Sequence, residues 1–435
     1  MARVVVIGGG IAGLGAAWAL RNQGIDVVVL EKEEEAGGRM RSFKWGDTWI
    51  DRGAGETTGD SVEMRAAARE LGVKEIPHHG NEHMTTRVYK GGEIYEVDSM
   101  DPTSYLKFGA ISWMGRARMA AIIPALLKQT RINPDHKREP WLAAWADTES
   151  IDTWLGRIAP EFLEFAAEPM LAGQASWDPS QLGKGFFLHL FTSHKQVELL
   201  TFEEGMGQVT RALAATLDVR TGASATRLDV GDPPMTVNYE QGGESKTIDA
   251  DHVIVAVPGT RVLDFVNGLD EPRRRFFRRV TYVPADWLTL KMPEPPAGLE
   301  GMVYFPRKED RDIARAGWHE YPTNPDDWMF TILCKYQFAR QMLDWSGDAK
   351  YRAKIDALER YWPNIESTTT EWKQVGFREG IPAFPTGYCR DLGEFVHLKP
   401  LSGISFAGDY LAGPATEYAF ETGQTAARDA LARMG

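Results

Sequence analysis

The first thirty residues carry two short apolar runs with a helical pattern between them. Residues 3–7 form a β-branched run, as in a strand buried on both faces of a parallel sheet. Residues 11–23 are rich in Ala and Leu and contain no proline, which favours a helix, and Gly24 stands where a helix usually ends. Residues 27–30 are again apolar and predict the next strand. This order predicts a βαβ unit.

Two further apolar runs of the same character lie far along the chain. Residues 253–257 are apolar without interruption and stop at Pro258. Residues 404–407 are followed by a glycine, an aspartate and a helical pattern over residues 416–434. Both runs therefore predict buried strands like the first two.

The turn after the first strand has the spacing G-x-G-x-x-G. Its first glycine permits a tight turn, its second lets the backbone approach a pyrophosphate, and its third lets helix and strand pack closely. The helix that follows offers free N–H groups to an anionic phosphate. Glu31 ends the second strand, where it can accept hydrogen bonds from an adenosine ribose. The pattern predicts dinucleotide binding through Gly8, Gly10, Ile11, Ala12, Gly13 and Glu31.

The segments between the predicted strands differ in pattern. They carry many of the tryptophans and prolines and show no βαβ rhythm. We therefore predict an α/β fold in which a Rossmann-type nucleotide-binding domain is interleaved with an α+β substrate-binding domain. The nucleotide-binding domain is expected at residues 1–75, 201–262 and 371–435, and the substrate-binding domain at residues 76–200 and 263–370.

Residues 36–42, AGGRMRS, follow directly on the second strand. They resemble the glycine-glycine-arginine signature of the flavin amine oxidase superfamily, which includes amine oxidases, protoporphyrinogen oxidases and carotenoid desaturases. In that signature the glycines let the backbone reach the FAD diphosphate, and the arginine adds a charge-assisted contact. The resemblance implies FAD, held without a covalent link, as the cofactor. A colourless protein that binds NAD but no flavin would instead establish a nicotinamide enzyme.

Four further segments resemble the same superfamily in the same order. IDRGAG at residues 50–55 resembles the turn beside the flavin, and GMGQV at residues 205–209 resembles the entry to a returning segment that ends at residues 254–258. FAGD at residues 406–409 resembles the motif in which an acidic side chain binds the ribitol and the next helix points its N-terminus at the flavin. The resemblance implies FAD contacts from Gly38, Arg39, Gly53, Ala54, Gly408, Asp409, Ala415 and Thr416, with the backbone of Ala225 near the adenine.

The adenine side departs from the superfamily pattern. Relatives often carry a basic residue between the ribose-binding glutamate and the glycine pair, and here Lys32 is followed by three glutamates. The resemblance leaves Lys32 as the basic contact. We interpret the glutamates as a solvated charge run.

Three features typical of amine oxidases in this superfamily are missing. Their lysine near the reactive flavin nitrogen falls near Asp286, and their two aromatic cage positions fall near Gly380 and Ala415. Lys291 lies nearby, but strand alternation does not bring it to the position of that lysine, so we interpret it as a surface lysine. Simple amine oxidation is therefore not the leading expectation.

Two segments resemble protoporphyrinogen oxidases instead. Residues 149–182 resemble a small helix, a Glu168-Pro169 turn and a following Asp-Pro-x-x-Leu, and residues 380–388 resemble a stretch near the flavin. Residues 412–417 look more like isoprenoid desaturases. The small residues at positions 380 and 415 would leave room above the flavin for a broad, flat or elongated substrate.

The resemblance implies an FAD-dependent oxidase or dehydrogenase that removes a hydride from an apolar or heteroaromatic small molecule, as protoporphyrinogen oxidases do. The flavin performs the oxidation, so no acid–base triad is required and no catalytic side chain is assigned. Molecular oxygen or a quinone is the expected electron acceptor. Alternatives are an amine oxidase with an atypical pocket, an isoprenoid or carotenoid-type desaturase, and a non-catalytic FAD-binding scaffold. The oligomeric state stays open.

The composition limits the other classes of protein. At 435 residues, with 43% apolar and 25% charged residues, the chain suggests two or three ordered domains. The net charge of −12 argues against nucleic-acid binding, which needs a basic face. Cys334 and Cys389 cannot form a disulfide framework and suit a reducing compartment. There is no signal-peptide pattern and no apolar run of about 18 residues or more, so we expect a cytoplasmic protein.

Two other groups of residues suggest no further chemistry. His78, His79 and His83 lack the spacing of a preformed metal site, so we expect a loop cluster and no metal. Cys389 lies several residues past the position expected for a covalent flavin link, so we expect none.

One segment raises the question of membrane contact. Residues 108–128 are apolar, interrupted by Arg116 and Arg118 and followed by further basic residues. Such a stretch could lie in a membrane interface. We favour a buried helix near a substrate cavity, because apolar helical stripes mostly face cores, and expect at most peripheral membrane contact.

Overall fold

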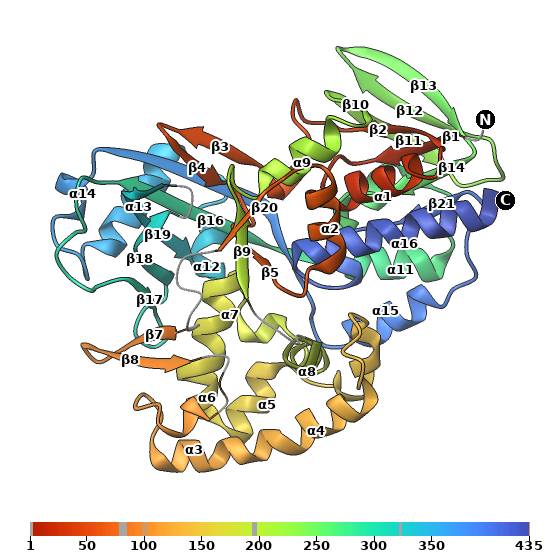
Figure 1. Ribbon diagram of the computed structural model, residues 1–435. Coiled ribbons are helices and arrows are strands. Elements are labelled where there is room, and N and C mark those ends of the chain that lie inside the picture. Colours follow the sequence, from red (N-terminus) through yellow and green to blue (C-terminus); the bar gives the residue numbers. More distant parts are fainter. Residues whose placement is uncertain are drawn as a thin grey trace.

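The computed structural model describes residues 3–77, 85–98, 101, 103–193, 198–321 and 324–434 (Figure 1). The expected loop cluster of His78, His79 and His83 lies outside these residues. Figure 1 shows both chain ends at one side of the molecule, beside a parallel sheet, and a second sheet and a group of helices further away.

A five-stranded parallel sheet contains all four buried strands that the sequence predicts. Both of its faces are covered, since Val4 and Val6 pack into one apolar cluster while Val5 and Ile7 pack into another. This is why these strands are apolar at nearly every position. In spatial order the strands are β10 (Asp218–Arg220), β2 (Asp26–Leu30), β1 (Arg3–Ile7), β14 (His252–Val255) and β21 (Ile404–Phe406).

Two helices from opposite ends of the chain pack against each other on one face of this sheet (Figure 1). They are α1 (Ile11–Arg21) and α16 (Thr416–Met434). A Cβ on Gly423 would overlap the Ala12 carbonyl oxygen, so glycine is required for their close approach. The C-terminal helix is thereby held against the first turn of α1.

Smaller elements surround the parallel sheet. A four-stranded sheet has the order β13 (Glu244–Ala250), β12 (Met235–Gln241), β11 (Ala223–Asp229) and β15 (Val266–Asn267). A hairpin joins β3 (Ser42–Trp45) to β4 (Thr48–Asp51), and β9 (Leu199–Phe202) lies between β5 (Thr57–Thr58) and β6 (Glu75–Pro77). The helices of this part are α2 (Val62–Glu70), α9 (Gly207–Ala214), α10 (Val262–Phe265), α11 (Glu271–Arg279) and α15 (Tyr388–Val396).

The second large sheet has seven strands. One of its faces buries Leu288 and Leu290 against α13 (Gly347–Leu358) in a separate apolar cluster. Its order is β20 (Glu371–Ala383), β16 (Thr281–Lys291), β19 (Asn324–Cys334), β18 (Ile313–Tyr321), β17 (Met302–Tyr304), β7 (Thr85–Lys90) and β8 (Glu93–Asp98). Beside it lie α12 (Tyr336–Gln341) and α14 (Ile365–Thr368).

The predicted domain limits stay a prediction, but β20 bears on one of them. The strand begins at residue 371, where we placed the start of the last nucleotide-binding segment, yet it pairs with β16 in the seven-stranded sheet from residue 371 to residue 383. The alternation of half-buried and exposed residues along β20 predicts a strand, but it does not indicate which of the two sheets that strand joins.

A group of helices forms the lower part of the molecule in Figure 1. They are α3 (Trp113–Met119), α4 (Ile123–Ile132), α5 (Ile151–Ile158), α6 (Pro160–Phe162), α7 (Glu168–Ala175) and α8 (Lys184–Ser193). The buried helix expected over residues 108–128 is wrong: this stretch forms α3, a short 3₁₀ turn and the start of α4, with Trp113, Met114 and Ile123 exposed. Among the described residues, no helix is long and apolar enough to cross a membrane.

Candidate cofactor and active site

The glycine turn between β1 and α1 has the geometry that its spacing predicts. Gly8 has a φ of 108°, and a Cβ there would lie 2.6 Å from the Ala256 carbonyl oxygen. A Cβ on Gly10 would meet no atom within 4 Å, so open space faces this residue. The first intrahelical hydrogen bond of α1 runs from the Leu14 N–H to the Gly10 carbonyl (2.9 Å), which leaves the N–H groups of residues 11–13 at the helix end. Space and donors together fit a phosphate.

Glu31 is held beside this turn. Its buried carboxylate accepts hydrogen bonds from the N–H groups of Gly9 (2.6 Å) and Glu33 (2.8 Å). Its carbonyl accepts a hydrogen bond from the Ala223 N–H (2.8 Å), which brings the start of β11 close. Ala225 lies two residues further along β11, next to a β-bulge, so its backbone is near this end of the sheet. Lys32 is exposed, and its amine lies 3.5 Å from the Glu33 carboxylate.

The glycine-glycine-arginine segment lies against the glycine turn. The Gly37 N–H donates to the Gly9 carbonyl (2.8 Å), and a Cβ on Gly38 would lie 3.5 Å from the Gly10 Cα. The next predicted segment meets the arginine of this one, because a Cβ on Gly53 would overlap the Arg39 carbonyl oxygen. The Ala54 N–H donates to the same oxygen (3.2 Å). Three motifs that are separate in sequence therefore form one continuous surface.

Arg39 joins this surface to the C-terminal motif. Its Nη1 lies 2.7 Å from Asp409 Oδ2 and donates to the Gly380 carbonyl (2.8 Å). The Tyr282 hydroxyl donates to Asp409 Oδ1 (2.8 Å). Burial alone would lower the pKa of Arg39, but the neighbouring Asp409 carboxylate raises it above its usual range. Burial, and then Asp409, raise the pKa of Tyr282 well above its usual value, so its hydroxyl stays protonated as a donor.

The sequence did not identify Tyr282 or the Gly380 carbonyl as partners of this acid. It also left out Asp51, which joins the IDRGAG turn (residues 50–55) to the segment around Met206. The Asp51 carboxylate accepts from the Ser42 hydroxyl (2.5 Å) and the Met206 N–H (2.8 Å). Burial raises the pKa of Asp51 to about 7. Its place in the predicted IDRGAG segment was the available signal.

Ala415 and Thr416 stand at the start of α16. The Ala419 N–H donates to the Ala415 carbonyl (3.2 Å), so the preceding N–H groups lie at the helix end. Gly408 is tied to the same helix, because its N–H donates to the Thr422 hydroxyl (2.9 Å). The C-terminal turn and the helix N-terminus are therefore fixed relative to each other.

Strand β16 carries no lysine at the position where the resemblance placed the amine oxidase lysine. The Asp286 carboxylate is buried on the α13 side of the sheet, in ion pairs with Lys354 and with Lys350 (3.2 Å). On the opposite face, a Cβ on Gly380 would lie 2.7 Å from the Ala285 Cβ. Lys291 is half-buried at the far end of the strand, where its backbone lies opposite Glu371 of β20 in the sheet register.

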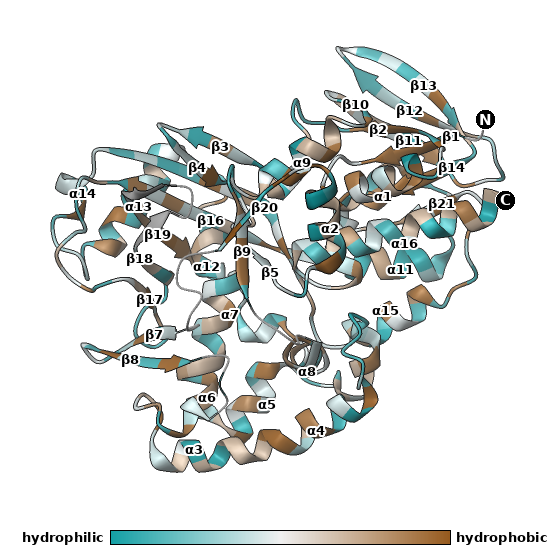
Figure 2. Ribbon diagram, in the orientation of Figure 1, coloured by the Kyte–Doolittle hydropathy of each residue, from teal (hydrophilic) through white to brown (hydrophobic). Residues whose placement is uncertain are grey.

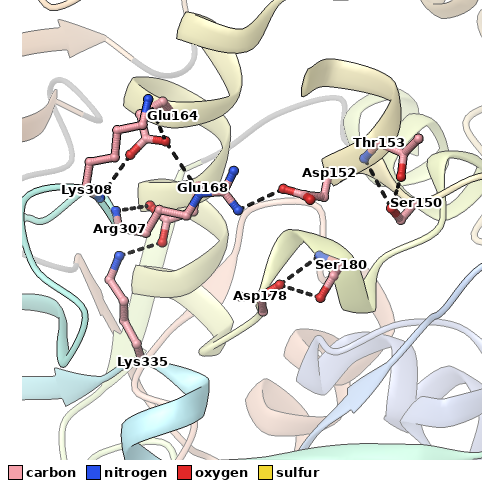
Figure 3. A network of polar contacts seen from close by, with 10 residues as sticks. All are labelled: Ser150, Asp152, Thr153, Glu164, Glu168, Asp178, Ser180, Arg307, Lys308 and Lys335. Carbon is pink, nitrogen blue, oxygen red and sulfur yellow. Dashed lines mark hydrogen bonds and ion pairs between the residues drawn. The ribbon is translucent and has the colours of Figure 1, made fainter. Parts of the chain in front are cut away.

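The expected turn at Glu168-Pro169 is wrong. Glu168 instead begins α7, directly after a π-helical turn (Leu163–Ala167). Its buried carboxylate pairs with Lys335 (2.5 Å) and accepts from the Arg307 N–H (3.0 Å). Figure 3 shows that these contacts, with those of Glu164, tie the helices to the loop after β17 and to the end of β19.

The two remaining expectations concern metals and cysteine. Among the described residues, no group of three or more His, Cys, Asp and Glu side chains could hold a metal ion. Cys389 is buried in α15, where its N–H donates to Asp147 Oδ2 (2.7 Å), and burial raises the pKa of its thiol well above the usual value. That Cys389 forms no flavin link stays a prediction.

A parallel sheet with a glycine turn and a buried glutamate at the end of its second strand is the arrangement of a dinucleotide-binding protein. The sequence profile of the family described as flavin containing amine oxidoreductase matches residues 11–431, and the chain belongs to that family. It is an enzyme that uses FAD, acts on a small molecule and passes electrons to an acceptor such as oxygen.

Known relatives differ in substrate. A probable flavin-containing monoamine oxidase A from Dictyostelium discoideum is 25% identical over 93% of this chain and 91% of its own length. A mitochondrial protoporphyrinogen oxidase from Nicotiana tabacum is 26% identical over 48% of this chain and 38% of its own. Wild-type putrescine oxidase bound to putrescine superimposes with a TM-score of 0.78, with 18% identity and 99% of both chains covered, which shows the fold.

Proposed function

We propose that one extended FAD lies along the surface formed by the glycine turn, the Gly38–Arg39 segment and the C-terminal acidic turn. The open space at Gly10 suits the diphosphate, and the helix N-terminus behind it supplies N–H donors. Glu31 would accept from the ribose, and Asp409 from the ribitol. The proposed contacts are Gly8, Gly10, Ile11, Ala12, Gly13, Glu31, Lys32, Gly38, Arg39, Gly53, Ala54, Ala225, Gly408, Asp409, Ala415 and Thr416.

We propose that the reaction is removal of a hydride from an apolar or heteroaromatic substrate, as in protoporphyrinogen oxidases. The observation that carries this proposal is the neutral, small-residue contact of Ala285 with Gly380, on a strand whose one acid, Asp286, faces away toward two lysines. Such a surface would exclude water and recognise a substrate by its shape rather than by its charge. It suits a substrate that is held by apolar contact while a C–H bond is oriented.

The bound FAD would supply the oxidising chemistry. The residues of this chain then hold and orient: Arg39 and Tyr282 fix Asp409, and the first turn of α16 directs N–H groups toward the proposed flavin end. Such donors stabilise negative charge without adding a titrating group. Molecular oxygen or a quinone would take the electrons.

Amine oxidation with an atypical pocket is the second candidate. It is favoured by the breadth of the similarity to the Dictyostelium discoideum relative, since the tobacco relative aligns over only about half of this chain. An isoprenoid or carotenoid-type desaturase differs from the leading proposal only in the shape of the substrate. The alternative from outside the enzymes is a scaffold that binds FAD without catalysing a reaction, and the family match argues against it.

Anaerobic reduction of the bound flavin by a panel of porphyrinogens, isoprenoids and amines tests these candidates. Loss of flavin absorbance with a porphyrinogen or another apolar substrate, and not with amines, supports the proposal. Bleaching by amines, with release of ammonia or an aldehyde, would overturn it in favour of the second candidate. Bleaching by dithionite but by no organic compound in a broad panel would favour the scaffold.

A further inference from the structure

One edge of the molecule exposes an unusual set of apolar side chains. It is the outer face of α3, α4 and the turn before them, which we call the basic apolar edge. It forms the lower rim in Figure 1 and carries strongly hydrophobic segments beside hydrophilic ones in Figure 2. Trp113 is 73% exposed and Leu106 is 65% exposed, although side chains of this size are usually covered. The exposed apolar members are Leu106, Trp113, Met114, Ile123, Leu127 and Ile132.

The charge of this edge is opposite to that of the protein. From residue 103 to residue 134 the sequence contains no Asp and no Glu, whereas the whole chain has a net charge of −12. The cations of the segment are Lys107, Arg116, Arg118, Lys128 and Arg131.

The exposed side chains cannot turn inward, because the inner face of the same helices is already filled. Ile111 just before α3 and Ile122 between α3 and α4 are buried on the inner side, and a Cβ on Gly115 would lie 2.7 Å from Ile111. The start of α3 is fixed by Glu161, whose carboxylate accepts from the N–H and the hydroxyl of Ser112 (2.7 Å each). The inner side of α4 is fixed by Gln129, which accepts from the Trp145 indole N–H (2.8 Å). The outer face is therefore a permanent surface of the fold.

We propose that the basic apolar edge docks on the surface of an anionic phospholipid bilayer. Apolar side chains that include a tryptophan, flanked by Lys and Arg, are the composition that enters the interface between headgroups and acyl chains, and Glu161, which is bound to Ser112, leaves the five cations of the segment in excess. The cations add attraction to anionic lipid, by about fivefold in affinity for each. A second copy of the chain is less suited to this face. If two copies docked through the same edge, the five cations of one would repel the five cations of the other.

Flotation of the FAD-loaded enzyme with lipid vesicles tests the proposal. We expect it to float with vesicles that contain phosphatidylglycerol, to bind pure phosphatidylcholine vesicles much more weakly, and to be released by high salt. The double variant Trp113→Ser, Met114→Ser should weaken binding about tenfold or more, because it removes the insertable apolar area. The double variant Arg118→Glu, Arg131→Glu should weaken it about 25-fold or more.

A matched control removes an exposed tryptophan elsewhere. Trp345 is 46% exposed in the loop between α12 and α13, and Trp345→Ser should leave vesicle binding unchanged. Flavin absorbance and the unfolding temperature report whether each variant is folded. The proposal is overturned if the wild-type enzyme fails to float with anionic vesicles, or if both double variants float as well as the wild type. It is also overturned if the edge mediates a dimer in solution that the Trp113 variant abolishes while no vesicle binds. Since no substrate is used, the outcome is independent of the proposed reaction.

Discussion

The pairing of Arg39 with Asp409 links the first and last motifs of the chain, and a double-mutant cycle on this pair tests whether that link is real. The perturbations are Asp409→Ala, Arg39→Met and the two combined. The Asp409 side chain is 8% exposed and that of Arg39 is 31% exposed. Breaking a fully buried ion pair costs about 3–5 kcal/mol, and a hydrogen bond to a charged group contributes about 1.5–3 kcal/mol. Because Arg39 is partly solvated, we expect a coupling free energy of about 2 kcal/mol in the protein without FAD.

Urea unfolding of the FAD-free protein measures this coupling. Asp409→Ala also removes the acceptor of the Tyr282 hydroxyl, so this variant should lose more stability than Asp409→Asn, which keeps an oxygen at the same place. If the ribitol contact is correct, Asp409→Ala should also weaken FAD binding about 10- to 100-fold, and Asp409→Asn less. Single-variant effects that add to within about 0.5 kcal/mol in the double variant would refute the pairing.

Three further predictions follow from the contacts at the site and beneath the second sheet. Gly10→Ala should leave the stability of the FAD-free protein unchanged, because the new Cβ meets no protein atom, but should lower FAD affinity in a fluorescence titration. A loss of stability in the FAD-free protein, or an unchanged FAD affinity, would contradict the phosphate assignment. Because burial raises the pKa of Asp51 to about 7, the folded protein holds a proton that the unfolded chain releases near pH 4, so the unfolding free energy falls as pH rises between these values. Asp51→Asn should flatten that fall, compared by urea unfolding at about pH 5 and pH 8. Asp286→Asn leaves the buried Lys354 without its anion and should cost about 3–5 kcal/mol by the same assay, whereas Asp356→Asn on the exposed side of α13 should change stability by less than about 0.5 kcal/mol.

The parts of the fold that the sequence predicts are those whose cause is local. A strand buried on both faces must be apolar at successive positions, which is why residues 253–257 could be recognised without any partner. A glycine against which another backbone packs leaves no choice of residue, as at Gly8 and Gly53. These local requirements produced the glycine turns and the parallel strands.

The parts that the sequence does not predict depend on which distant segments meet. Tyr282 and Asp409 are 127 positions apart, and only the pairing of β16 with β20 brings the Gly380 carbonyl to Arg39. The exposed edge at α3 and α4 escaped prediction for a related reason. An apolar stripe along a helix indicates that one face avoids water, but it does not indicate whether protein or lipid covers that face.

The geometry of β16 also limits how substrate choice can change in this protein. On one face of the strand, Asp286 forms ion pairs with the lysines of α13. On the other face, Ala285 packs so closely against β20 that its Cβ leaves no room for a methyl group on Gly380. A lysine at position 285 would need to displace β20, and through the Gly380 carbonyl it would disturb Arg39. A lysine at position 286 would lie beside two buried lysines instead of their anion. A single lysine at position 285 or 286 is therefore expected to disturb the pairing of β16 with β20 or the buried charges beneath it, and not simply to add an amine beside the proposed flavin.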